Sequence, residues 1–271
     1  MTGRETLGWL RAYTFAVAAI YVAVTPLEHF AVFPASLHEQ IGAARLLPSF
    51  VWSALHDRVV LIAVKVVLAL GLSACAIGVP TYRFLAPASV ALFVLHQCLV
   101  RIDKSGHREL ALLYCLLVLA AFPAADAVAL RIKQARAKNS AESTYQLGLL
   151  LTGFVFLFTY AAPAVYRLAH AAPAIFLDGS MAHYVVANGG ELRNGTFGFA
   201  WGAALVGRGP TAVFFLNVGF VAATFSEALA LFCLVNRPFR WAWLAFCVSF
   251  HFANLLLLNI DFILNTLLAP A

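Results

Sequence analysis

The sequence predicts an all-helical (all-α) integral membrane protein, a polytopic bundle of about seven transmembrane helices. Three observations predict this fold class. Of the 271 residues, 63% are hydrophobic and only 11% are charged, whereas roughly a quarter of the residues in a soluble domain are charged. The mean hydropathy is +0.88. The apolar residues also gather in segments close to the ~20 residues that a helix needs to cross a bilayer core.

Each apolar segment is predicted to be a helix, because an open strand would leave unpaired backbone groups in hydrocarbon. In chain order the segments cover residues 9–27, 59–79, 84–100, 110–122, 146–166, 211–235 and 241–264. The first is expected to be a retained anchor, because no small-residue cleavage site follows it. The fourth is short, so it must be tilted or extended by its flanks. Residues 196–206 are apolar enough to enter the membrane as well, which leaves the span count open by one.

The sequence contains neither a domain linker nor a metal motif. Gly/Ser-rich linkers, low-complexity tracts and internal repeats are all missing, so residues 1–271 are predicted to form a single domain. The cysteines lie mostly within apolar runs, and they form no CxxC pair and no metal-ligand spacing. They are therefore interpreted as small buried side chains, and no metal site is predicted.

The basic residues predict the orientation of the bundle. The net charge is +6, but the dense basic run lies in one short loop between two apolar segments, which argues against a nucleic-acid partner. That run consists of Arg131, Lys133, Arg136 and Lys138. Cytoplasmic loops carry an excess of such residues, so the amino terminus is predicted inside and the carboxyl terminus outside. The predicted location is the cell membrane, as a multi-pass protein of a bacterial inner membrane.

The last apolar segment carries a polar stripe. At 100° per residue, its polar side chains fall within an arc of about 80°. They are His251, Asn254, Asp261 and Asn265. An ionisable group in a membrane span costs about 2.5 kcal/mol or more unless it has a partner or a cavity. This face is therefore expected to line a cavity that opens outward.

Glu227 is expected to lie beside His251. A short turn over residues 236–240 joins the last two segments, so their helices are antiparallel neighbours and the two residues have similar depths. A hydrogen bond between them, direct or through one water, would ease the desolvation of both. Two interpretations stay open: a structural clamp between helices, and part of a cavity for a substrate or cofactor.

With the segments placed, residues 54–262 resemble the horizontally transferred transmembrane (HTTM) family, which includes vitamin K-dependent gamma-glutamyl carboxylase. Asp103-Lys104-Ser105-Gly106-His107 resembles the family's Asp-Lys loop, which leads through a histidine into an apolar helix. Tyr160-Ala161-Ala162-Pro163-Ala164-Val165-Tyr166-Arg167-Leu168 resembles the Tyr-Ala-Gly-Val-Lys-Lys-Leu segment of the carboxylases. Phe250-His251-Phe252-Ala253-Asn254 resembles their Phe-His-x-x-Asn run.

The resemblance implies a membrane-embedded site that binds a quinone or a vitamin K-like lipid. In the carboxylases a lysine of the Val-Lys-Lys-Leu stretch is the proposed base, but here the pair reads Tyr166-Arg167. Arginine stays protonated where a desolvated lysine can lose its proton, so glutamyl carboxylation is not expected. The implied catalytic residues are His251, Glu227 and His107. The implied substrate-binding residues are Asn254, Asp261 and Arg167, and the polar stripe adds Asn265.

Two classes of function follow. The first is a modifying or maturation factor for a lipid-soluble or peptide substrate, with membrane lipid and a small thiol–disulfide or peptide partner. In this first class of function, His251, Glu227 and Asn254 bind or relay protons, while His107 and Arg167 hold an anionic group at the cavity mouth. The alternative is a non-enzymatic transporter or assembly partner that uses the same polar stripe. The missing inverted repeats speak against a secondary transporter.

Overall fold

A computed structural model describes residues 1–32, 48–100, 109–128, 140–170, 182–183, 185–186, 201–258 and 263–269. The regular secondary structure of these residues is all helical, without a strand. Among them, six helices are long and apolar enough to cross a membrane, and the shorter apolar helix Leu110–Ala121 coincides with the fourth predicted segment. The prediction of a multi-pass, all-helical membrane protein is therefore confirmed. The seventh span and the orientation stay predictions.

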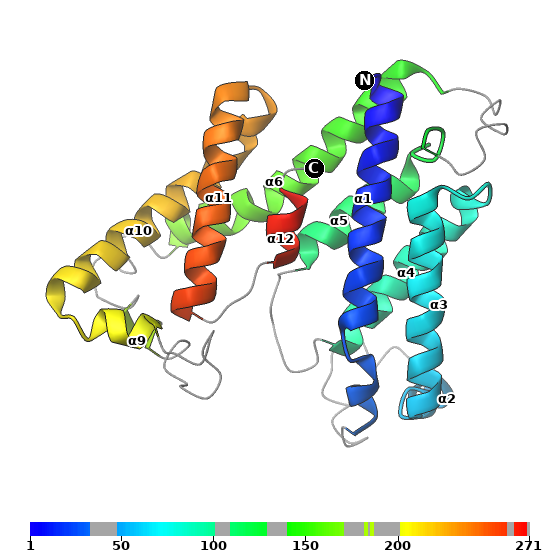
Figure 1. Ribbon diagram of the computed structural model, residues 1–271, viewed down its shortest axis with the longest axis horizontal. Helices are drawn as coiled ribbons and strands as arrows, with labels where there is room; N and C mark the ends of the chain where they lie inside the picture. Colours follow the sequence, from blue (N-terminus) through cyan, green and yellow to red (C-terminus); the bar gives the residue numbers. More distant parts are fainter. Residues whose placement is uncertain are drawn as a thin grey trace. The chain divides into compact units, whose positions relative to one another are not determined.

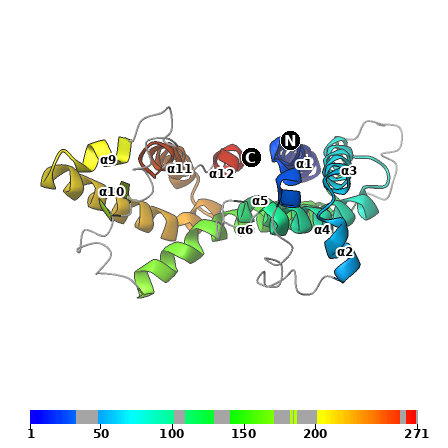
Figure 2. The ribbon, with the colours of Figure 1, turned by 90° about the horizontal axis from the view of Figure 1, so that it is seen from below.

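The chain divides into two compact units, Met1–Thr152 and Gly153–Ala271, and each is described by itself. Unit 1 contains α1 (Gly3–Val24), the 3₁₀ helix η1 (Leu27–Val32), α2 (Ser49–Ala54), α3 (Arg58–Ile77), α4 (Tyr82–Val100), α5 (Leu110–Ala121) and the first part of α6 (Glu142–His170). α1 packs along α3, α3 against α4, and α4 against α5. Figures 1 and 2 both show α1 and α3 side by side.

Local signals explain where α3 begins and ends. Asp57 caps its first turn, since the carboxylate accepts hydrogen bonds from the amides of Val59 at 2.7 Å and Val60 at 3.4 Å. Gly78 ends the helix in the left-handed conformation, with φ of 72°. Only glycine adopts this conformation without a steric penalty. These two residues place the helix within one or two residues of the predicted segment 59–79.

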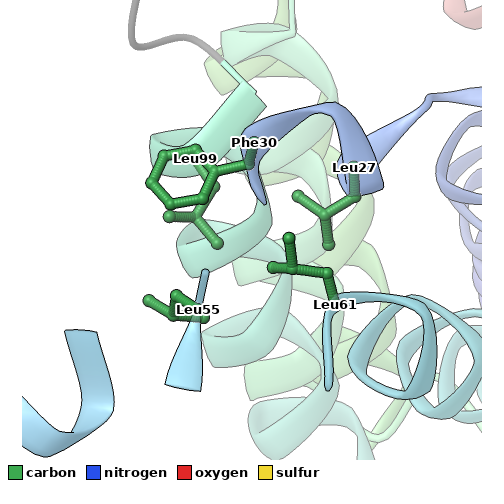
Figure 3. Packing of buried hydrophobic residues seen from close by; sticks show 5 residues of the cluster. All are labelled: Leu27, Phe30, Leu55, Leu61 and Leu99. Carbon is green, nitrogen blue, oxygen red and sulfur yellow. The ribbon is translucent and has the colours of Figure 1, made fainter. Parts of the chain in front are cut away.

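An apolar cluster holds one end of unit 1 together. It consists of Leu27, Phe30, Leu55, Leu61 and Leu99, each at most 5% exposed. Figure 3 shows these side chains converging from η1, the residue after α2, α3 and α4. Burying a leucine or phenylalanine side chain stabilises a fold by about 1.5–3 kcal/mol. The cluster therefore fixes η1 against the two long helices.

A buried arginine holds the other end of unit 1. Arg11 of α1 is fully buried. Its guanidinium donates to the carbonyl of Cys75, in the last turn of α3, at 2.8 Å and to that of Val128 at 2.7 Å. It also lies over the Tyr82 ring, 5.8 Å from the centroid. A cation that neutralises carbonyls at a helix carboxyl end is electrostatically favourable, so Arg11 ties α1 to α3 and to the segment after α5.

Unit 2 contains the rest of α6, α9 (Trp201–Val206), α10 (Pro210–Ala228), the 3₁₀ helix η6 (Ala230–Leu234), α11 (Arg237–Leu258) and α12 (Ile263–Leu268). α11 packs against η6, α9 and α12, and α9 also packs against α10. The predicted segment 211–235 is not one α-helix, because α10 ends at Ala228 and a 3₁₀ helix follows it. Gly202 lets α9 approach α11, since a Cβ there would collide with the Leu257 backbone.

The predicted segment 241–264 is not one helix either. α11 ends at Leu258, and α12 begins at Ile263. His251 and Thr266 would lie about 22 Å apart in a continuous helix, yet the His251 Nδ1 and Thr266 Oγ1 atoms are 2.8 Å apart. α12 therefore folds back along α11. The single helical stripe predicted from His251 to Asn265 is wrong, because helical periodicity carries no information about where a helix turns back.

Candidate intramembrane polar site

Polar side chains from the helices of unit 2 meet around His251. α6 contributes Tyr160 and Arg167, which lie seven residues apart in the sequence and so on one face of that helix. α10 contributes Glu227, and α11 contributes His251 together with neighbours on its buried side. α12 adds its own polar residues to the same region. This set defines the polar site of unit 2.

His251 is the centre of a short hydrogen-bonded chain. Its Nδ1 lies 2.8 Å from the Thr266 hydroxyl, and its Nε2 lies 3.5 Å from the Tyr160 hydroxyl. The Tyr160 and His251 rings stack with centroids 5.7 Å apart, and the Cys247 sulfur is 3.9 Å from both ring nitrogens. Only 4% of His251 and 6% of Tyr160 are exposed. A neutral imidazole has one donor and one acceptor nitrogen, so it can carry a proton between the two hydroxyls.

Trp243 closes one side of this chain. Its ring meets the Tyr160 ring edge to face, at 5.2 Å and 90°. Its indole N–H donates to the Ser226 carbonyl at 3.1 Å, which satisfies the one donor that a buried tryptophan must place. The Trp243 ring therefore holds the Tyr160 ring in place, and the Tyr160 hydroxyl stays directed at His251.

Glu227 pairs with Arg167. The Arg167 guanidinium donates to the Glu227 carboxylate and, through its other terminal nitrogen, to the Thr224 hydroxyl at 3.1 Å. It also lies over the Phe220 ring, 5.6 Å from the centroid. Among the described residues Glu227 makes no direct hydrogen bond with His251, and their contact through one water stays a prediction. Arg167 reaches the carboxylate from α6, a third helix that the pairing argument did not include.

Asn254 and Asn265 are both buried, at 8% and 6% exposed. The Asn265 side chain lies beside Tyr160, and its Oδ1 has no hydrogen-bond partner among the described residues. A buried acceptor without a partner costs about 1–3 kcal/mol, so this atom is suited to a ligand donor. His107 and Asp261 lie outside the described residues, and their predicted roles stay predictions.

The arrangement supports proton transfer and polar binding more than the capture of an anion. The Tyr160–His251–Thr266 chain carries exchangeable protons in a region with little access to water. The positive charge of Arg167 is already compensated by Glu227, so an anion must compete with that carboxylate. An intramembrane arginine without a partner would be costly, which explains why the pair forms.

Three residues of this site were missed by the reasoning from sequence. They are Tyr160, Cys247 and Thr266, which contact His251. The spacing of Cys247 and His251, four residues apart on one helix, was a usable signal for their contact. The spacing of Tyr160 and Arg167 likewise placed them on one face. No sequence signal places Thr266 against His251, because this contact depends on the reversal between α11 and α12.

The comparisons with known proteins assign neither a family nor a function to this polar site. No protein-family model matches the chain, and neither the curated proteins nor the solved structures contain a significant match. What is established is a multi-pass helical membrane protein, by the length and apolar composition of its helices.

Proposed function

We propose that this protein is a membrane-embedded modifying or maturation factor of the HTTM type, acting on a lipid-soluble or peptide substrate. The observation that carries the proposal is the buried chain of Tyr160, His251 and Thr266, 3.5 Å and 2.8 Å between successive polar atoms. Ionisable groups inside a membrane span mark functional sites by default, because they are costly to keep there. Asn265 supplies an acceptor that a substrate donor can satisfy.

In this proposal His251 is the acid–base residue, and Tyr160 and Thr266 set its tautomer. Glu227 and Arg167 form the charged end of the site, and Asn254 and Asn265 bind the polar part of the substrate. The cavity is proposed to open toward the outer face of a bacterial inner membrane. A quinone or a vitamin K-like lipid is the proposed cofactor by resemblance, and a thiol–disulfide or peptide partner is the proposed associate.

The geometry supports a function that differs from glutamyl carboxylation. Arg167 stands where the family pattern has a lysine, and its guanidinium pairs with the Glu227 carboxylate. A guanidinium keeps its proton at every working pH, so it cannot deprotonate a reduced vitamin K. The base of any proton transfer in this site is therefore a residue other than Arg167, and His251 is the buried candidate.

The experiment is mass spectrometry of lipid-soluble molecules that co-purify with the protein in mild detergent. Tyr160→Phe and His251→Gln remove hydrogen-bonding atoms of the chain, and Tyr166→Phe is the matched control, since Tyr166 is 64% exposed on the same helix. We expect a polar-headed molecule bound to the wild type and the control and reduced at least about tenfold in the two variants, the effect of one lost hydrogen bond of ~1.4 kcal/mol.

Equal amounts of every co-purified molecule in all four proteins would contradict the proposal. A loss of thermal stability in the two variants without a change in bound molecules would favour the alternative, in which the chain is a structural clamp in a transporter or assembly partner. The two outcomes are distinguishable because binding and unfolding are measured on the same samples.

A further inference from the structure

A groove lies between α9 and α10, separate from the residues of the polar site. Its volume is about 410 Å³, and it is lined by Leu205, Arg208, Thr211, Ala212, Phe215 and Leu216. This volume falls within the roughly 300–1,000 Å³ of small-ligand pockets. Leucine and phenylalanine side chains form its apolar wall, and an arginine and a threonine form its polar end. The groove is thus amphipathic along its length.

Among the described residues, the arginine side chain at its polar end has no partner. Arg208 is exposed. Its backbone N–H donates to the Leu205 carbonyl at 3.1 Å, but among the described residues its guanidinium makes neither a hydrogen bond nor an ion pair. Arg167 in the same unit differs in this respect, because Glu227 compensates its charge. A guanidinium has planar donors that match two phosphate oxygens. The charge at this end of the groove is therefore available to an anion.

The residues around the groove place its polar end at the membrane surface. α10 begins at Pro210, two residues after Arg208, so the arginine lies where this transmembrane helix leaves the hydrocarbon. Trp201 at the start of α9 is 46% exposed, and tryptophan is enriched at the level of lipid head groups. Phe214 and Phe215 of α10 are 61% and 67% exposed, as expected of side chains that face acyl chains.

We propose that this groove binds an anionic phospholipid. The phosphate contacts the Arg208 guanidinium and the Thr211 hydroxyl, and an acyl chain lies along Leu205, Phe215 and Leu216. A net-anionic head group is favoured because no acidic side chain in the described part of unit 2 pairs with Arg208, whereas a zwitterionic head group brings its own ammonium to the phosphate. Basic pockets between membrane helices bind anionic head groups by this mechanism.

Native mass spectrometry of the purified full chain tests this proposal. The protein is equilibrated with mixed micelles that contain phosphatidylglycerol and phosphatidylcholine in equal amounts. We expect the wild type to retain phosphatidylglycerol in preference. Arg208→Gln should weaken the binding of phosphatidylglycerol about fivefold, which corresponds to ~1 kcal/mol, and leave phosphatidylcholine unchanged. Ala212→Phe, which fills the groove, should reduce the binding of both lipids.

Arg237→Gln is the matched control. Arg237 is also an exposed arginine of unit 2 at the start of a transmembrane helix, and it is not among the residues that line the groove. This variant should bind phosphatidylglycerol as the wild type does. Equal losses in Arg208→Gln and Arg237→Gln would show that general surface charge attracts the lipid, and would overturn the proposal. A wild type without preference for phosphatidylglycerol would overturn it as well.

Discussion

Removing both partners of the Arg167–Glu227 pair together should destabilise unit 2 by less than the sum of the two single removals. The pair joins α6 to α10, and the two side chains are only 27% and 12% exposed. Arg167→Met leaves the carboxylate of Glu227 buried without a partner and also removes the hydrogen bond to Thr224. In Arg167→Met/Glu227→Leu the same volume is filled by apolar groups, which suit a protein interior surrounded by lipid.

The magnitudes follow from the burial of the pair. Removing one partner of a buried ion pair costs about 3–5 kcal/mol, whereas replacing both by apolar residues of similar volume is often neutral. We expect about 3 kcal/mol for Arg167→Met, because the carboxyl group can take up a proton and so limit the penalty. For Glu227→Leu we expect about 2 kcal/mol, since Arg167 keeps its contacts with Thr224 and Phe220. The double variant should lose no more than Arg167→Met alone, which gives a coupling energy of about 2 kcal/mol.

The measurement is reversible unfolding of the full chain in mixed micelles with increasing dodecyl sulfate, followed by tryptophan fluorescence. The Lys65–Glu28 pair of unit 1 is the control, because its single contact is 3.5 Å long. Its coupling energy should be smaller than that of the Arg167–Glu227 pair, because a hydrogen bond of this length is weak. Additive effects of Arg167→Met and Glu227→Leu would refute the reasoning, since additivity means that the two groups do not interact.

Three further predictions concern topology, backbone conformation and chemistry. Reporter fusions at Asn139 and after the last residue should give opposite signals, as an inside amino terminus with about seven spans requires; matching signals would exclude that topology. Gly78→Ala should cost more than the about 1–2 kcal/mol expected for its φ of 72°, because the new Cβ would also collide with the guanidinium of the buried Arg11. Gly219→Ala, where a Cβ meets nothing within 4 Å, should be neutral or stabilising by up to about 1 kcal/mol; the same unfolding titration measures both. The wild type should show no vitamin K epoxidation, because Arg167 cannot act as the base. If the missing lysine is the reason, Arg167→Lys should gain this activity. Robust epoxidation by the wild type would show that another residue supplies the base.

The sequence by itself determined the fold class and the positions of most helices. Apolar composition and segment length are properties of the chain alone, and the bilayer sets the length that a span must have. Local signals determined helix ends as well, as Asp57 and Gly78 do for α3. The burial of His251, Asn254 and Asn265 also agrees with the polar side that the sequence assigned to the last segment.

Only the tertiary structure decided which polar groups meet. The sequence paired Glu227 with His251 because a short turn joins their helices, but depth along a helix leaves its rotation and its other neighbours undefined. In the structure α6 brings Arg167 to Glu227, and α12 folds back to bring Thr266 to His251. Helical periodicity describes one helix at a time, whereas a hydrogen bond needs two side chains in register across a packed interface. The thickness of the membrane therefore determined which segments form helices, and the packing of those helices determined which residues form the site.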